Sequence, residues 1–162
     1  IPVTVTDRKC VNKNLSTTDP APEETREADY SAPDAKVLAV DDNETNLMIV
    51  KFFLKRVGIE PELCSNGNAA IEKCRETKYD LILLDHMMPD PDGMETLEMI
   101  RNDAGSLNTD TPALILTANA MTGSRQMYME AGFADYLTKP IDSAVLEQTV
   151  KRFLPEEKII PV

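Results

Sequence analysis

From Lys36 onward, short apolar segments alternate with segments that have helical periodicity. The runs "LILL" (81–84) and "ALIL" (113–116) contain no polar residue that could face solvent. A strand with one exposed face would alternate apolar and polar side chains, so these runs indicate strands that are buried on both faces. Such strands, each followed by a helix, build βαβ units and a parallel sheet with helices on both sides. The sequence therefore predicts a doubly wound α/β fold.

Five strands and five helices are expected in strict alternation. The first helix repeats apolar residues on one face from Leu47 to Val57, Gly58 ends it, and Asp142 caps the last helix. The expected strands are "KVLAV" (36–40), "EPELCS" (60–65), "YDLILLD" (79–85), "PALILT" (112–117) and "ADYLTK" (134–139). The expected helices are "NETNLMIVKFFLKRVG" (43–58), "NAAIEKCRETK" (68–78), "GMETLEMIRND" (93–103), "TGSRQMYMEAG" (122–132) and "DSAVLEQTVKRFL" (142–154). We expect a (βα)5 three-layer sandwich of the flavodoxin-like type, with strand order 2-1-3-4-5.

The chain divides unevenly into three parts. Residues 1–35 are interpreted as an upstream stub and a flexible acidic linker, because residues 12–36 have few large apolar groups with which to offset the entropy of folding. The first residues, "IPVTV", alternate like the end of a strand, and the missing initiator Met suggests a piece of a longer chain. Residues 36–155 form the predicted domain and residues 156–162 a C-terminal tail.

Composition excludes several functional classes. The 28 acidic and 17 basic residues give a formal charge of −11, which disfavours direct binding to nucleic acid or anionic lipid. No segment has the roughly 20 apolar residues of a membrane span, and the N-terminus is not a signal peptide. Cys10, Cys64 and Cys74 lack a metal-ligand spacing, so we expect reduced thiols in a cytoplasmic protein.

Polar side chains of complementary charge follow four of the predicted strands. Asp41 and Asp42 follow the first strand, Asp85 ends the third, Thr117 the fourth, and Lys139 the fifth. Because the carboxyl ends of parallel strands share one edge of the sheet, these groups are expected to meet there. Taken alone, Asp41 and Asp42 could instead cap the first helix, and Asp85 could form a turn.

The chemistry that suits this set is phosphoryl transfer to a carboxylate. Three clustered carboxylates repel one another unless a divalent cation lies among them, and hard oxygen ligands suit Mg²⁺. Asp85, at the centre, is the predicted nucleophile and would form an aspartyl phosphate. Lys139 and the Thr117 hydroxyl would each bind a phosphoryl oxygen.

The stretches "VLAVDDNETNLMIV", "DLILLDHMMPDPDG", "ALILTANA" and "DYLTKPID" resemble the motifs of two-component receiver domains in their order and approximate spacing. The resemblance covers residues 36 to about 154. It implies that Asp85 accepts a phosphoryl group from a phosphohistidine on a kinase or phosphotransfer domain, and that the domain catalyses its own phosphorylation and dephosphorylation. It further implies that Asp42 and Asp85 bind Mg²⁺ through side chains, Met87 through its backbone carbonyl, and Asp41 mostly through water.

The resemblance also implies a conformational switch. Thr117 would move toward the phosphoryl group and Tyr136 would turn inward, changing the partners of the face made by the fourth helix, fifth strand and fifth helix. The Lys139–Pro140 bond is expected to be cis, which costs an X-Pro bond only about 0.5–1 kcal/mol. Pro91 departs from the family pattern without touching the chemical groups. His86 is expected to point away from Asp85 and to have a structural role.

Two features favour a parent protein of the hybrid sensor histidine kinase type. "DDNETN" with Asn46 resembles receivers attached to such kinases, and "IPV" resembles the last strand of a kinase ATP-binding domain. The chain also ends soon after the last helix, which suggests no output domain downstream. The domain is expected in the cytoplasm, on a parent for which a membrane anchor is an option. The oligomeric state is left open.

Other functions remain as alternatives. The chain could be a stand-alone response regulator, or a degenerate receiver that only serves as a docking scaffold. A hydrolase of the haloacid-dehalogenase type would need a second Asp where Met87 stands, and in a flavin-binding module the loop "DDNETN" would repel the cofactor phosphate.

Overall fold

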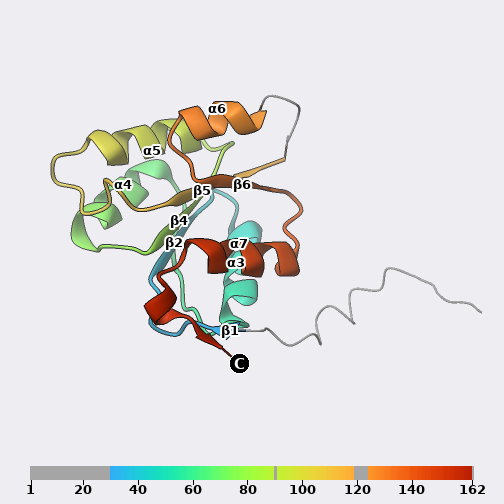
Figure 1. Cartoon of the computed structure of the whole chain (residues 1–162). Helices are drawn as coiled ribbons and strands as arrows, with labels where there is room; N and C mark the ends of the chain where they lie inside the picture. The colour runs from blue at the N-terminus through green and yellow to red at the C-terminus, as the bar shows by residue number, and fades with distance from the viewer. Residues whose placement is uncertain (1–29, 90, 119–123, 162) are drawn as a thin grey trace, which may run out of the picture.

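The computed structural model describes residues 30–89, 91–118 and 124–161. Its centre is a five-stranded parallel sheet (Figure 1). All five strands lie within the predicted segments, and each connection within the sheet is parallel, as the apolar runs predict. The strands are β2 (Val37–Val40), β3 (Glu62–Cys64), β4 (Leu81–Asp85), β5 (Ala113–Thr117) and β6 (Asp135–Thr138).

The order of strands across the sheet is β3-β2-β4-β5-β6. Counted within the sheet this is 2-1-3-4-5, so the predicted flavodoxin-like topology is confirmed. β2 lies between β3 and β4, and the direction of winding reverses there. In sheets of this kind the crevice for a ligand opens beyond the carboxyl ends of the strands at the reversal point.

Helices cover both faces of the sheet. The cluster on one face joins Leu47, Val50 and Leu54 of α3 to Leu146 and Val150 of α7. The opposite cluster contains residues of α4, α5 and α6, and Figure 1 shows these two groups of helices on either side of the sheet. The helices are α3 (Glu44–Lys55), α4 (Gly67–Glu76), α5 (Gly93–Asn102), α6 (Ser124–Glu130) and α7 (Ser143–Phe153).

Four of the helices begin at a side chain that accepts hydrogen bonds from their first turn. Asn43, Asn66, Asp92 and Asp142 are the N-caps of α3, α4, α5 and α7. Each of these caps satisfies backbone N–H groups that have no partner within the helix. Asn43 therefore takes the role that was the structural alternative for Asp41 and Asp42, and this leaves the two aspartates to other interactions.

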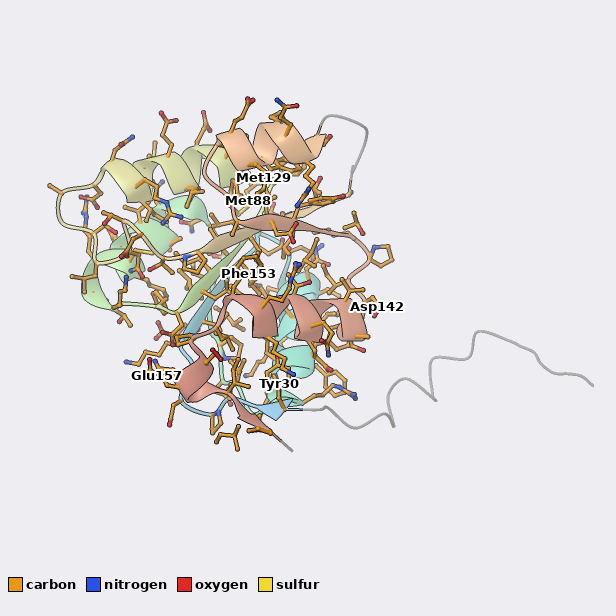
Figure 2. The ribbon with its side chains drawn as sticks, viewed as in Figure 1. Tyr30, Met88, Met129, Asp142, Phe153 and Glu157 are labelled. Carbon is orange, nitrogen blue, oxygen red and sulfur yellow. The ribbon has the colours of Figure 1, made fainter. Side chains whose placement is uncertain are left out.

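The packed unit extends beyond both predicted boundaries. Tyr30 and Ala32, which were predicted to lie in the linker, are buried, and Figure 2 shows Tyr30 beside α7. The Tyr30 hydroxyl donates to the Glu147 carbonyl at 2.7 Å. The short strands β1 (Tyr30–Ser31) and β7 (Ile160–Pro161) pair antiparallel. Lys158, in the predicted tail, contacts Asp80 at 2.8 Å. The stub "IPVTV", Cys10 and residues 12–29 of the linker lie outside the described residues.

A buried ion pair joins the two helices on one face of the sheet. Arg56 follows α3, and its Nε lies 2.9 Å from Oε2 of Glu147 on α7. The side chain of Glu147 is 1% exposed, so removal of the guanidinium would take a charged hydrogen bond from a buried carboxylate.

We predict that Arg56→Met lowers the free energy of unfolding by about 1.5–3 kcal/mol, because the buried Glu147 loses the charged hydrogen bond from the guanidinium. Urea unfolding followed by circular dichroism measures the change. The matched control is Arg152→Met, which breaks the more exposed pair with Asp135 and should cost about 0–1 kcal/mol. Equal losses in the two variants would contradict a special role for the buried pair.

Candidate functional site

The polar strand ends of the sheet form one acidic edge. Asp41 follows β2, and Asp85 is the last residue of β4; they are 2% and 3% exposed. Lys139 follows β6. Strand alternation places Asp41 and Asp85 on the same side as Ala39 and Leu83, whose side chains pack toward α3 and α7. The site therefore opens on the α3 side of the sheet.

Lys139 bridges the two buried carboxylates. Its Nζ lies 2.6 Å from Oδ1 of Asp85 and 3.4 Å from Oδ2 of Asp41. The Lys139–Pro140 peptide bond is cis, as expected from the family resemblance. The ammonium and carboxylate groups come from residues 54 and 98 positions apart, so the fold rather than the local sequence brings them together.

Charge and burial shift the proton equilibria of this pair. Burial raises the pKa of Asp85, the hydrogen bond from Lys139 opposes this, and the negative charge of Asp41 adds to the increase. Burial acts to lower the pKa of Lys139, but the hydrogen bond and charge of Asp85, together with Asp41, raise it above its ordinary value. Lys139 is thus held as a cation, and its positive charge compensates the negative charge of the buried Asp85 carboxylate.

The acidic trio fits a divalent cation. Asp41, Asp42 and Asp85 each offer a carboxylate oxygen, and these atoms lie within 4.8 Å of one another. Asp42 is exposed, so one side of the cluster is accessible to water. An all-oxygen site that is partly open to water matches the preference of Mg²⁺, which retains several of its own waters.

At position 93, after the loop that follows Asp85, there is room for glycine only. Residue Gly93 donates its N–H to the His86 carbonyl at 3.1 Å and begins α5. A Cβ atom added at Gly93 would lie 2.4 Å from the Asp85 carbonyl oxygen and 3.1 Å from Cα of His86. Because these neighbours are backbone atoms, any side chain here would displace the segment that carries Asp85.

Thr117 lies on the other side of the sheet from Asp85. By strand alternation its side chain is on the same face of the sheet as those of Ala113 and Ile115, which pack against residues of α4, α5 and α6. Its Oγ1 accepts a hydrogen bond of 3.1 Å from the hydroxyl of Tyr128 on α6. The Tyr128 oxygen also lies 3.1 Å from Nδ1 of His86. A polar chain thus runs from His86 through a buried tyrosine to Thr117.

Comparison with known proteins identifies the chain. The family model described as "Response regulator receiver domain" matches residues 37–151. This chain belongs to the receiver domain family. The matched segment contains the three strand ends that form the site, from Asp41 to Lys139, and Thr117 as well.

Relatives of known identity agree with this assignment. "Signal transduction histidine-protein kinase BarA" of Escherichia coli (strain K12) is 38% identical over 119 residues, which are 74% of this chain and 13% of the kinase. The receiver domain therefore spans only a small part of the length of the curated relatives that it matches first. Among the described residues, no helix is long and apolar enough to cross a membrane.

Solved receiver structures have the same fold. The receiver domain of sensor histidine kinase PA1611 from Pseudomonas aeruginosa PAO1, solved with a magnesium ion coordinated in its active site cleft, is 32% identical with a TM-score of 0.65. The match covers 74% of this chain and 96% of that one. A chain of the co-crystal structure of the Saccharomyces cerevisiae phosphotransfer protein Ypd1 with the receiver domain of Ssk1 is 27% identical, with a TM-score of 0.70 and coverage of 78% and 92%.

Some of the predicted site residues meet at the sheet edge, and others do not. Asp41, Asp42, Asp85 and Lys139 come together, whereas the Thr117 hydroxyl accepts a hydrogen bond from Tyr128 on the other side of the sheet. The role of the Met87 carbonyl stays a prediction, and the Met87 side chain is exposed. Tyr136 is half-buried, and its ring centroid lies 6.3 Å from that of Tyr128. Its predicted switch role also stays a prediction.

Tyr128 was not among the residues that the sequence predicted for the site. His86 was expected to point away from Asp85, and its side chain does contact a different partner, on α6. The only signal for Tyr128 was its place in a helical segment rich in Met, which indicates packing rather than a hydrogen bond to a strand end.

We predict that Gly93→Ala lowers the free energy of unfolding by about 1–3 kcal/mol, since the added methyl group overlaps the Asp85 backbone. It should also weaken Mg²⁺ binding, because Asp85 is displaced with its backbone. Thermal unfolding and calorimetric titration with Mg²⁺ measure the two effects. In the control Gly105→Ala, the nearest atom outside the neighbouring residues is 3.6 Å away, so both quantities should stay close to the wild type. A Gly93→Ala protein with unchanged Mg²⁺ affinity would refute the close approach.

Proposed function

We propose that this receiver domain accepts a phosphoryl group from a phosphohistidine onto Asp85. The observation that carries the proposal is the contact between Asp85 and Lys139 at the acidic edge, 2.6 Å long and flanked by Asp41. In the reaction the P–N bond of the phosphohistidine breaks and a bond forms between phosphorus and a carboxylate oxygen of Asp85. The electron pair of the broken bond stays on the histidine nitrogen. With uptake of a proton the imidazole ring leaves in its neutral form.

Lys139 has a defined task in this reaction. Its ammonium group neutralises the Asp85 carboxylate in the unmodified domain. An aspartyl phosphate places its negative charge on the phosphoryl oxygens, within reach of the same ammonium group. Lys139 can therefore exchange one anionic partner for another without leaving the site, and the charge that develops during transfer is compensated throughout.

Mg²⁺ is the proposed cofactor of the site. The side chains of Asp42 and Asp85 would bind it directly, the Met87 carbonyl would be a further ligand, and Asp41 would act mostly through water. The bound cation supplies positive charge that draws together the acidic side chains and the phosphoryl oxygens. The oxygen atoms of the trio, within 4.8 Å of one another, support this ligand set.

We predict that the wild-type chain gains one phosphoryl group when incubated with Mg²⁺ and acetyl phosphate, as measured by intact mass. Asp85→Asn should gain none, since its amide is not a nucleophile, and chelation of Mg²⁺ should abolish uptake by the wild type. The control Asp110→Asn alters a carboxylate with an 82% exposed side chain that pairs with Lys78, so its uptake should be unchanged. Equal uptake by Asp85→Asn and the wild type would reassign the nucleophile.

An apolar face of α3 lies next to the site and suits the phosphohistidine donor. Met48 and Phe52 are 59% and 54% exposed, and Ile49 is also exposed. Ile49 lines a groove of about 250 Å³ that is also lined by Asp41 and Lys139. The donor histidine must reach Asp85 from outside, so its domain must cover the surface beside this groove. Exposed apolar side chains at that place favour a protein partner.

We predict that Phe52→Ser slows phosphoryl transfer from a phosphorylated histidine phosphotransfer domain by about 10-fold or more, as loss of an apolar anchor does at other interfaces. The phosphotransfer domain is one that phosphorylates the wild-type chain. Labelling by acetyl phosphate should not change, because the small donor needs no docking surface. Met99→Ser, on α5, removes a comparably exposed apolar side chain from the other face of the sheet and serves as the control. A similar loss with both donors would point to a damaged site instead.

We propose that the domain belongs to a hybrid histidine kinase. The support is its similarity to a segment of much longer histidine kinases, such as BarA. A stand-alone response regulator is the alternative. The free, buried thiols of Cys64 and Cys74 suit a reducing compartment, which supports the cytoplasm as the site of action.

The proposed output of phosphorylation is a change in the surface made by α6, β6 and α7. This surface carries the exposed apolar residues Met127, Met129 and Val145. Thr117 and Tyr136 are the proposed switch residues, and both contact Tyr128 beneath this surface.

A further inference from the structure

Tyr128 is a buried polar residue with no role in the proposed transfer reaction. It is 2% exposed and packs edge-on against His86 with 5.4 Å between ring centroids. The rings of Phe133 and Tyr136 lie 6.5 Å and 6.3 Å from it. This enclosure restricts the ring, so its hydroxyl oxygen has a defined position between His86 and Thr117.

The Tyr128 hydroxyl links His86 to Thr117 through two hydrogen bonds. A tyrosine hydroxyl has a single hydrogen, which Tyr128 donates to Oγ1 of Thr117. Its oxygen can then accept from Nδ1–H of His86, 3.1 Å away. In this chain the hydroxyl oxygen of Thr117 is held toward α6.

This arrangement holds Thr117 away from the place where it would bind a phosphoryl group. Asp85 and Lys139 lie on the α3 side of the sheet by strand alternation, whereas Thr117 and Tyr128 lie on the α6 side. Threonine is β-branched, and its side chain occupies discrete rotamers. A hydroxyl that turns over the sheet edge toward Asp85 must therefore leave the Tyr128 hydroxyl.

We infer that Tyr128 is a positioning residue that holds Thr117 in the unphosphorylated state and releases it on phosphorylation. The inference rests on the proposed function, because it assigns the competing partner of Thr117 to a phosphoryl group on Asp85. Two mutually exclusive hydrogen bonds of one hydroxyl make a two-state element, and a group bound in only one state shifts the equilibrium toward that state. Because Tyr128 lies between Met127 and Met129 on α6, its release links the sheet edge to an exposed surface.

The test uses Tyr128→Phe, which removes the hydroxyl and keeps the ring. With Mg²⁺ saturating, beryllofluoride binding is titrated for the whole chain, with the intrinsic fluorescence of its tyrosines as the signal. Since a neutral hydrogen bond stabilises the unphosphorylated state by a modest amount, its loss should tighten beryllofluoride binding about 3- to 10-fold. Tyr79→Phe is the matched control. Tyr79 lies before β4, at the amino end of that strand, and its hydroxyl donates to Glu62, so its removal should leave the affinity unchanged.

A second background separates this bond from general effects of the mutation. In Thr117→Val the acceptor oxygen is absent, so adding Tyr128→Phe should produce no further change in affinity. An unchanged or weaker affinity for Tyr128→Phe alone, or an equal gain in the Thr117→Val background, would overturn the inference. Wild-type chain that fails to bind beryllofluoride would instead refute the proposed function.

An independent measurement covers the case in which Tyr128→Phe does not fold. In the wild type, the ¹³Cζ resonance of Tyr128 reports the hydrogen bond of its hydroxyl. It should shift when beryllofluoride binds, while that of Tyr79 should not. A Tyr128 resonance that stays unchanged at saturation would show that the bond to Thr117 persists, and would overturn the inference equally.

Discussion

The contact between Lys139 and Asp85 is the interaction on which the rest of the site depends. Two buried carboxylates beside each other are costly unless cations compensate them, and Lys139, directly after the last strand of the sheet, provides one such cation. The site is therefore arranged around an anion that has one protein cation in contact and space for a metal. The proposed phosphoryl transfer would use this arrangement, because the ammonium group of Lys139 can compensate the negative charge of a phosphoryl group.

The sequence predicted the sheet and its edge because both follow from short-range patterns. Apolar runs locate the strands, and the residues after them, such as Asp41 and Asp85, must meet if the sheet is parallel. The starts of helices, such as the one that Asp142 caps, could be predicted equally well, because capping depends on side chains within a few positions. These features need only the chain direction and the periodicity.

What the sequence could not predict depends on three-dimensional register. The Tyr128 hydroxyl reaches Thr117 because α6 packs at a certain height on the sheet, and no pattern in "MYMEAG" encodes that height. The boundaries were missed for a similar reason. Tyr30 follows a polar stretch, and no local apolar pattern marks it as a core residue, yet it is buried and donates to the Glu147 carbonyl of α7.

The pairing of β1 with β7 has a consequence for how this receiver domain can be joined to other domains. Ala32 donates its N–H to the Val57 carbonyl just beyond the end of α3, and this helix runs back from the acidic edge to the opposite end of the sheet (Figure 1). The first and last described residues thus leave the molecule together, at the pole remote from Asp85. A neighbouring domain that is linked here would attach opposite the acidic edge. It would leave that edge accessible both to a donor and to an acceptor of the phosphoryl group.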